Sequence, residues 1–394
     1  MKNMNALHQK NILLGITGGI AAYKSAYLCR LLTECNANVQ VVMSNAATKF
    51  ITPLTFETLS HHKVLTDTFT EPLAHIDFAK TADLILIAPA SANTLAHLAN
   101  GLANNLLQNI VLARRCPLLL APAMNTAMWE NPATKRNVAM LENDGIQILH
   151  PICGSLACGD VGRGKMMEPA GILEAAELLL SPKILKDKKI VITAGPTFEK
   201  IDSVRGLTNL SSGKMGYALA HAAKNAGAKV TLISGKVALP APENVDFIAT
   251  TSAEEMHRAA LSFLGKMDVF ISVAAVSDYR PKNAVTHKLK KNKERLNTLE
   301  LTENPDILAE IAAAKNAPFC VGFAAESENL LANAREKRQK KNIPLIVAND
   351  IAQGFGGENN RIFLIDSENQ SEFFGKKTDL AWEIIQNIAQ KLKK

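Results

Sequence analysis

The sequence predicts an α/β protein with two doubly wound, Rossmann-like domains, each built on a parallel sheet. Short apolar runs alternate with helical stretches along the whole chain, which is the pattern of parallel strands covered by helices on both faces. The chain has 394 residues, more than one hydrophobic core commonly serves. A polar segment near its middle, residues 181–188, carries a proline and three lysines and indicates a linker. We therefore expect one domain over residues 1–181, a linker over 182–188 and a second domain over 189–394.

Both predicted domains contain five apolar runs of strand length. In the first domain these are residues 11–16, 39–43, 84–88, 117–121 and 146–149. In the second domain they are residues 189–193, 229–233, 269–273, 319–323 and 345–348. The third and fourth runs of each domain end in turns of small residues. Ligands of such folds bind beyond the carboxyl ends of the strands, so these turns are where a site is expected.

The composition limits the classes of function. Charged residues make up 21% of the chain and the net charge is +7, an excess that suits anionic substrates better than nucleic acid. Six cysteines are too few for a disulfide framework. The sequence has no apolar run near the length that spans a bilayer and no secretory signal pattern. We expect a cytoplasmic enzyme that binds neither nucleic acid nor membranes.

A glycine-rich turn follows the first predicted strand. Gly15, Thr17, Gly18 and Gly19 lie in the string GITGGIAAYK, where backbone N–H groups at a helix N-terminus can bind a phosphate. The spacing differs from the GxGxxG of dinucleotide folds, and the second strand ends at Ser44 without an acid for an adenosine ribose. The turn favours a mononucleotide such as FMN over NAD. The alternative is an ordinary tight turn between a strand and a helix.

Polar residues in later segments of the first domain extend this candidate site. Ser91 lies in the string APASANT, and Asn125 lies beside Met124 in APAMNTAMW. An amide can donate and accept hydrogen bonds together, which suits a carboxylate or amide substrate. His75, before the third strand, has the side chain best suited to move protons near neutral pH.

Residues 150–171 hold five glycines and two cysteines, which predicts a flap that closes over a ligand. The two cysteines are separated by four residues and have no second pair nearby, which argues against zinc. We interpret Cys153 as structural. Cys158, beside Gly159 in the flap, is the better candidate for a chemical role.

The second domain carries a different candidate site for anions. Ser211, Ser212, Gly213 and Lys214 lie just before a predicted helix over residues 217–227, where they can cradle an anion. The string is not a P-loop, because Met215 stands where Ser or Thr should bind magnesium.

Further polar residues of this domain follow its strands. Asp278 lies in the turn after the third strand, and a lysine cluster over residues 288–291 comes soon after. Lys337 and Lys341 lie four apart, on one face of a predicted helix. A lysine run is most often a solvated face, but after a strand-end turn we favour a binding role.

These motifs resemble two known families. GITGGIAAYK, His75, PAMNTAMW and ACGDVGRGKM resemble flavin-containing phosphopantothenoylcysteine decarboxylases. The strings AGPT, LSSGKMG, AAVSDY and KLKK resemble bacterial phosphopantothenate–cysteine ligases. The resemblance covers nearly the whole chain, in the order of the bacterial bifunctional proteins of coenzyme A biosynthesis. Thr17, where Ser is common, and Leu207-Thr208 depart from the usual pattern.

For the first domain the resemblance implies decarboxylation of 4'-phosphopantothenoylcysteine to 4'-phosphopantetheine with FMN as the cofactor. His75 is implied as the base of an oxidative half-reaction, Asn125 as a ligand of the substrate, and Cys158 as the proton donor of a reductive half-reaction. A trimer-based homo-oligomer, commonly a dodecamer, is implied as well. The implied FMN-binding residues are Gly15, Thr17, Gly18, Gly19, Ser44, Ser91 and Met124.

For the second domain it implies ligation of L-cysteine to 4'-phosphopantothenate with CTP, through an acyl-cytidylate. Lys288 is implied in the first step, and Asn209 is implied to hold the carbonyl of the intermediate. Mg²⁺ is expected to offset phosphate charge, and the sequence does not identify its ligands. The implied CTP-binding residues are Asp278, Lys288, Asn304, Pro305, Asp306, Ile307, Phe323, Lys337 and Lys341.

Two other classes share the motifs of the first domain. One is a flavin-dependent peptidyl-cysteine decarboxylase, and the other is a non-catalytic regulatory protein that keeps the flavin fold. The complete ligase-like second domain argues against the first class. Cys158 argues against the second.

Overall fold

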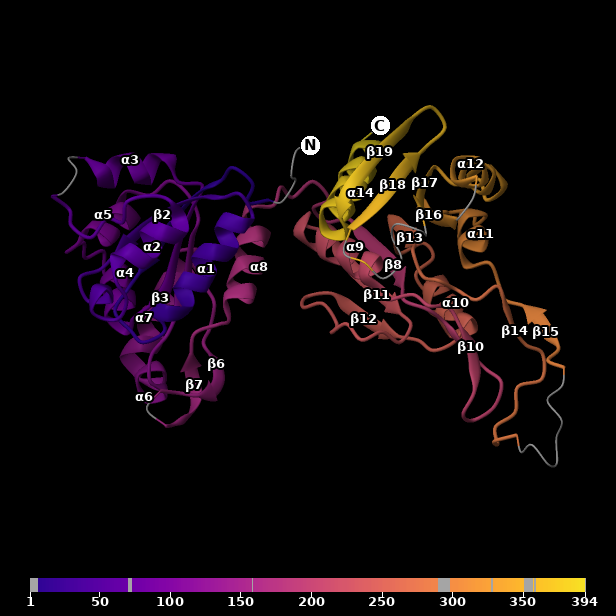
Figure 1. Ribbon diagram of the computed structural model, residues 1–394, viewed down its shortest axis with the longest axis horizontal. Helices are drawn as coiled ribbons and strands as arrows, with labels where there is room; N and C mark the ends of the chain where they lie inside the picture. Colours follow the sequence, from indigo (N-terminus) through magenta and orange to yellow (C-terminus); the bar gives the residue numbers. More distant parts are fainter. Residues whose placement is uncertain are drawn as a thin grey trace. The chain divides into compact units, whose positions relative to one another are not determined.

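The computed structural model describes residues 6–69, 73–157, 159–289, 298–326, 329–350, 357 and 359–393. It divides into two compact units, Met1–Ser181 and Pro182–Lys394. Each unit has its own sheet and its own buried clusters of apolar side chains (Figure 1).

The first unit is built on a five-stranded parallel sheet of order β2-β1-β3-β4-β5. The order reverses between β1 and β3, as in flavodoxin-like doubly wound sheets. The strands are β1 (Asn11–Ile16), β2 (Asn38–Met43), β3 (Leu84–Ala90), β4 (Leu118–Pro122) and β5 (Gln147–Ile148). A separate hairpin joins β6 (Ile152–Ser155) and β7 (Val161–Lys165).

Helices cover both faces of this sheet, which explains why its strands are continuous apolar runs. One buried cluster joins the sheet to α1, α2 and α8, and a second joins it to α3, α4, α5 and α7. The helices are α1 (Ala22–Glu34), α2 (Pro53–Ser60), α3 (Ala74–Thr81), α4 (Ala92–Ala99), α5 (Leu106–Ala113), α6 (Thr126–Glu130), α7 (Pro132–Asn143) and α8 (Pro169–Leu180), with a 3₁₀ turn at Ala47–Lys49.

The second unit contains an eight-stranded sheet of order β12-β11-β8-β13-β16-β17-β18-β19. The strands are β8 (Lys189–Ala194), β11 (Lys229–Ser234), β12 (Asp246–Ala249), β13 (Val269–Ser272), β16 (Phe319–Glu326), β17 (Leu345–Asp350), β18 (Asn359–Ile365) and β19 (Gln370–Lys376). The strands from β12 to β17 are parallel, whereas β18 and β19 are antiparallel to their neighbours. The sheets of both units confirm the predicted fold class, and the antiparallel edge is an addition to it.

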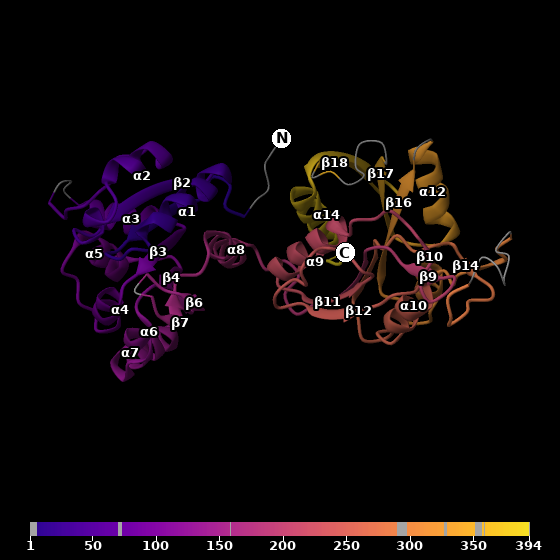
Figure 2. The same cartoon turned by 60° about the horizontal axis from the view of Figure 1, so that its bottom comes forward.

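The helices of the second unit also lie on both faces of its sheet (Figure 2). One cluster packs α9 and α14 against the sheet, and the other packs α10, α11 and α12 against the opposite face. These helices are α9 (Lys214–Asn225), α10 (Ala253–Leu261), α11 (Ile307–Ala312), α12 (Leu330–Lys340) and α14 (Lys377–Lys391). Two small hairpins join β9 (Phe198–Lys200) to β10 (Gly206–Thr208), and β14 (Tyr279–Pro281) to β15 (Leu301–Glu303).

The segment expected to be a linker packs against the second unit. Leu185 is buried in the same cluster as α9 and α14, and its N–H donates to Ala226 O at 2.9 Å. Residues 182–188 are therefore part of the second unit. Among the helices that the structure describes, none is long and apolar enough to cross a membrane.

Asp366 ties the C-terminal helix α14 to the turn between β18 and β19. Its carboxylate accepts the N–H groups of Glu368 and Asn369, both at 2.7 Å, and pairs with Lys391. Burial acts to raise the pKa of Asp366, but Lys391 and the two N–H groups outweigh it and lower the pKa from 3.8 to about 2.

We expect Asp366→Asn to lower the free energy of unfolding by about 2 kcal/mol at neutral pH. Because the folded pKa lies below the unfolded one, this contribution is complete above the unfolded value of 3.8 and is lost as the pH falls towards 2. Urea unfolding between pH 7 and pH 3 measures it, with the exposed Asp246→Asn as the control. A gap between Asp366→Asn and wild type that stays constant with pH would contradict the expectation.

Candidate active sites

Three hydroxyl residues predicted to hold FMN follow the carboxyl ends of neighbouring strands. Thr17 comes after β1, Ser44 after β2 and Ser91 after β3. The Thr17 hydroxyl donates to Pro89 O at 2.7 Å and accepts the Ser91 N–H at 2.9 Å. Ser91 in turn caps α4, since its Oγ accepts the Thr94 N–H at 3.3 Å. Thr17 and Ser91 are thus joined directly.

The glycine turn beside them has room for an anion. A Cβ on Gly18 would lie 2.5 Å from the Cβ of Ala46, so this turn packs closely on the segment after Ser44. A Cβ on Gly19 would meet no atom within 4 Å, so the adjoining space is open. The N–H groups of Gly18, Gly19 and Ile20 make no hydrogen bond to any described residue. Free N–H groups before helix α1 suit the phosphate of a mononucleotide.

Gly15 has a different position from the other glycines of the turn. It lies within β1, and a Cβ there would lie 2.7 Å from a side-chain carbon of Leu107 in α5. The structure therefore gives Gly15 a packing contact between sheet and helix.

Asn125 lies after β4, and hydrogen bonds fix both the oxygen and the nitrogen of its side-chain amide. Its Oδ1 accepts the Ala127 N–H at 2.8 Å, which caps α6, and its Nδ2 donates to Asp160 Oδ2 at 2.9 Å. The neighbouring Met124 N–H donates to Gly164 O at 3.0 Å. The expected flap is therefore a β-hairpin, β6–β7, attached to the Asn125 turn. Cys158 lies outside the described residues.

The close contact at Gly164 gives a test of this attachment. A Cβ on Gly164 would lie 2.2 Å from the carbonyl oxygen of Met124, whereas a Cβ on Gly154 would meet only a flexible lysine side chain at 3.2 Å. We expect Gly164→Ala to lower the free energy of unfolding by about 1–3 kcal/mol, because the hairpin must move away from Asn125. The same movement should slow decarboxylation. Denaturant unfolding and carbon dioxide release measure both effects. Gly154→Ala is the matched control, and equal behaviour of the two variants would contradict the attachment.

The helix that carries His75 lies apart from the segment that carries Asn125. His75 is the second residue of α3, which Figures 1 and 2 both show far from α6 and the β6–β7 hairpin. The chain path explains the separation, because α3 leads into the amino end of β3 while Asn125 follows the carboxyl end of β4.

The second unit contains a cavity of about 600 Å³ beside the carboxyl ends of β13 and β16. Most of the predicted ligase residues line it. These are Asn209, Ser211, Ser212, Gly213, Lys214, Asp278, Asn304, Pro305, Asp306, Ile307, Phe323, Lys337 and Lys341. Lys288 does not line the cavity. It is exposed, in the segment that follows β14.

Hydrogen bonds fix two of the asparagines in the cavity wall. Asn209 Nδ2 donates to Ala275 O at 3.1 Å and to Val276 O at 3.3 Å. Asn304 Nδ2 donates to Ser277 O at 2.8 Å. Both asparagines therefore join their own segments to the turn after β13.

The charged residues of the cavity are also held in place. Lys337 Nζ donates to Phe323 O at 2.9 Å. Lys341 pairs with Asp306 at 2.6 Å, and Asp306 also caps α11 by accepting the Ala309 N–H. Burial acts to raise the pKa of Asp306, but Lys341 and the Ala309 N–H lower it. The acid therefore stays ionised at neutral pH beside its lysine.

The structure adds cavity residues that the sequence motifs did not indicate: Asn349, Asn360 and Lys377. Asn349 lies near the carboxyl end of β17, and that position at a strand end could have indicated a cavity residue from the sequence. Lys377 begins α14 beyond the antiparallel edge, and no local signal marks it. Burial, and then the charge of Lys214, lowers the pKa of Lys377.

Comparisons with known proteins cover both units. A family model described as Flavoprotein matches residues 2–180, and a model described as DNA/pantothenate metabolism flavoprotein C-terminal domain matches residues 185–392. The chain is 48% identical to the coenzyme A biosynthesis bifunctional protein CoaBC of Vibrio vulnificus strain CMCP6, with 98% of each chain covered. It is 45% identical to the protein of that name from Bacillus subtilis strain 168, with 97% of each covered.

A crystal structure of the C-terminal domain of a CoaBC protein is 39% identical to this chain. It covers 54% of this chain and 98% of that one, with a TM-score of 0.47.

The two units thus define a flavoprotein unit followed by a pantothenate-metabolism unit. The chain belongs to the family of coenzyme A biosynthesis bifunctional proteins. It is an enzyme with two activities, phosphopantothenoylcysteine decarboxylase and phosphopantothenate–cysteine ligase, which confirms the resemblance found in its motifs.

Proposed function

We propose that the second unit joins L-cysteine to 4'-phosphopantothenate with CTP, and that the first unit decarboxylates the product to 4'-phosphopantetheine with FMN. The observation that carries the proposal is the cavity of the second unit, in which the motif residues of distant segments meet. The glycine turn of the first unit, with open space beside Gly19 and N–H groups that bond to no described residue, supports the flavin half.

In the ligase reaction the phosphopantothenate carboxylate attacks the α-phosphorus of CTP, and pyrophosphate leaves. The cysteine amine then attacks the acyl-cytidylate, and CMP leaves. Lys214, Lys337 and Lys341 supply positive charge to the phosphates. Asn209 holds the carbonyl of the intermediate, and Lys288 serves the first step. Ser211, Ser212 and Gly213 cradle an anionic group before helix α9.

Mg²⁺ belongs to the proposal as a partner of the nucleotide. Among the described residues, no group of three or more His, Cys, Asp or Glu side chains could hold a metal ion. Magnesium commonly binds through substrate phosphates and few protein ligands. When bound, it would neutralise charge on the triphosphate.

In the decarboxylase reaction FMN, when bound, would supply the reversible oxidation and reduction. Thr17, Gly18, Gly19, Ser44, Ser91 and Met124 would hold it. Asn125 orients the substrate carboxylate or amide, His75 removes the proton in the oxidative half-reaction, and Cys158 returns a proton in the reductive half-reaction.

The separation of His75 from Asn125 supports a site completed by another copy of the chain, in a trimer-based homo-oligomer that can extend to a dodecamer. A reducing, cytoplasmic location is part of the proposal, and Cys29, Cys116, Cys153 and Cys320 form no disulfide among the described residues.

Separate fragments test the proposal, because each unit has its own core. We expect residues 1–181 to be yellow and to release carbon dioxide from phosphopantothenoylcysteine. Residues 182–394, which keep Leu185, should release pyrophosphate from CTP with phosphopantothenate and cysteine, without flavin. The full chain in the coupled assay is the control. A folded but colourless first fragment would contradict the flavin assignment, and a folded second fragment without pyrophosphate release would contradict the ligase assignment.

A further inference from the structure

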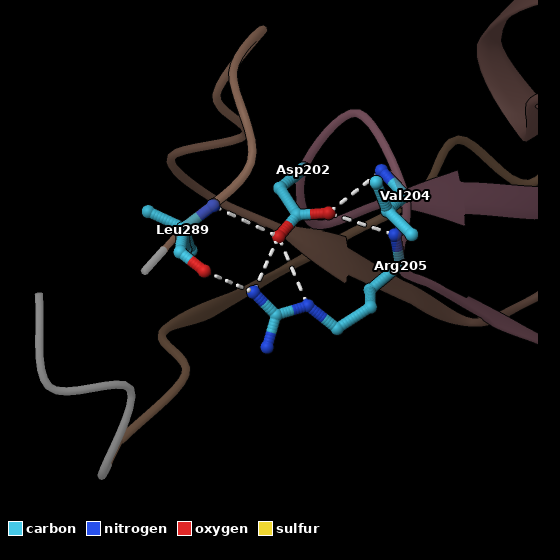
Figure 3. A network of polar contacts seen from close by, with 4 residues as sticks. All are labelled: Asp202, Val204, Arg205 and Leu289. Carbon is cyan, nitrogen blue, oxygen red and sulfur yellow. Dashed lines mark hydrogen bonds and ion pairs between the residues drawn. The ribbon is translucent and has the colours of Figure 1, made fainter. Parts of the chain in front are cut away.

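Asp202 is a buried acid in the turn of the β9–β10 hairpin. Its side chain has 0% exposed surface. One carboxylate oxygen accepts the N–H groups of Val204 at 2.8 Å and Arg205 at 2.7 Å. The other accepts Arg205 Nε at 2.9 Å, Arg205 Nη2 at 2.6 Å and the Leu289 N–H at 3.2 Å (Figure 3).

Leu289 follows Lys288 directly in the chain. Its carbonyl oxygen also accepts Arg205 Nη2 at 2.9 Å, so both of its backbone polar groups are bound to the hairpin (Figure 3). Four residues earlier, the Val285 N–H donates to Ile201 O at 3.2 Å. The segment that carries Lys288 belongs to no helix or strand, and it is held to the β9–β10 turn at both of these points.

The hairpin turn alone does not explain why residue 202 is an aspartate and not an asparagine. An asparagine could close the turn with its single carbonyl oxygen, as Asn and Asp both do in such turns. It could not accept three further N–H groups on its second atom, because that atom would be an NH₂ donor. The carboxylate is therefore explained by Arg205 and Leu289. Burial acts to raise the pKa of Asp202, but these hydrogen bonds hold it well below its ordinary value, so the acid stays charged.

The same hairpin also leads to the cavity. Strand β10 ends at Thr208, and the next residue, Asn209, donates to the carbonyl groups of Ala275 and Val276 in the cavity wall. The hairpin is therefore fixed to the cavity at one end and to the Lys288 segment at the other.

We propose that Asp202 is a positioning residue of the ligase: through Leu289 and Arg205 it fixes the backbone beside Lys288 relative to the β9–β10 hairpin and Asn209. The proposal rests on the role given above to Lys288. Because Lys288 is exposed and outside the cavity wall, the hydrogen bonds that hold the backbone of Leu289 limit where the Lys288 ammonium group can reach. Without those bonds, the lysine occupies its productive position for a smaller fraction of the time.

The test is Asp202→Asn in the full chain, since this change keeps the turn acceptor and removes the acceptor for Leu289. We expect kcat for pyrophosphate release from CTP and phosphopantothenate to fall at least about tenfold, with KM for CTP within about twofold of wild type. Hydrogen exchange should become faster in the peptide that contains residues 285–289. A change in kcat without a change in nucleotide KM is the signature of positioning.

Asp268→Asn is the matched control. Asp268 also accepts a backbone N–H, that of Lys189 at 2.8 Å, but at the amino ends of β8 and β13. The proposal is overturned if Asp202→Asn loses no more kcat than Asp268→Asn, or if its exchange at residues 285–289 equals that of wild type.

Two further variants separate the possible failures. If Lys288→Gln keeps wild-type pyrophosphate release, the role of Lys288 is wrong and the positioning proposal fails with it. If Lys288→Gln is inactive while Asp202→Asn is not impaired, only the positioning proposal fails. If Asp202→Asn does not fold, Leu289→Pro tests the positioning proposal in its place. This change removes the Leu289 N–H group that donates to Asp202 and leaves the hairpin residues unchanged. The same loss of kcat is expected, and a wild-type rate overturns the proposal.

Discussion

Lys288→Gln is expected to abolish pyrophosphate release from CTP and phosphopantothenate, even when cysteine is absent. In the proposed mechanism, the charge of Lys288 serves the step in which the carboxylate attacks phosphorus and negative charge develops on the phosphates. A burst of pyrophosphate in a rapid-quench experiment without cysteine isolates this step. Lys282→Gln is the matched control, because Lys282 is an exposed lysine of the same segment. Equal bursts from wild type and Lys288→Gln would refute the role.

Asn209→Asp should fail at the other step of the same reaction. An aspartate cannot donate to the carbonyl groups of Ala275 and Val276, so the side chain loses the bonds that place it in the cavity wall, and its negative charge repels the phosphate. We expect this variant to consume CTP and accumulate the intermediate, with slow formation of phosphopantothenoylcysteine. Mass spectrometry of quenched reactions distinguishes it from Lys288→Gln, in which no intermediate should form.

His75→Asn and Cys158→Ser are expected to fail differently in the decarboxylase reaction. In the proposed mechanism His75 acts when the substrate thiol is oxidised, so His75→Asn should leave the flavin oxidised and release no carbon dioxide. In the same proposal Cys158 acts later, when a proton must reach a carbon of the ene-thiol as a hydride reaches its neighbour. A thiol is mostly protonated near neutral pH and can donate that proton in a site that excludes water. Cys158→Ser should therefore release carbon dioxide and stop at a product two hydrogens short of phosphopantetheine.

Single-turnover product analysis measures both outcomes. Cys153→Ser is the control for the cysteine, because Cys153 is a nearby cysteine in the sequence and is exposed and free on strand β6. His61→Asn is the control for the histidine, because His61 is exposed after α2. Fully reduced phosphopantetheine at the wild-type rate from Cys158→Ser would show that another group donates the proton.

The sequence by itself determined the parallel strands and the residues at their ends. Strands such as β3 are buried along their whole length, so they are apolar at every position and visible without a structure. Strand-end residues such as Thr17, Asn125 and Asp278 could then be assigned to ligand-binding edges, because parallel strands end at the same edge of a sheet.

Only the tertiary structure decided contacts between segments far apart in the chain. The bond between Asp202 and Leu289 joins residues 87 positions apart, and neither neighbourhood carries a pattern that indicates the other. The separation of His75 from Asn125, the antiparallel edge of β18 and β19, and the place of Lys377 in the cavity are of the same kind. Local sequence specifies backbone conformation and burial, whereas these contacts depend on the path that the whole chain takes between its strands.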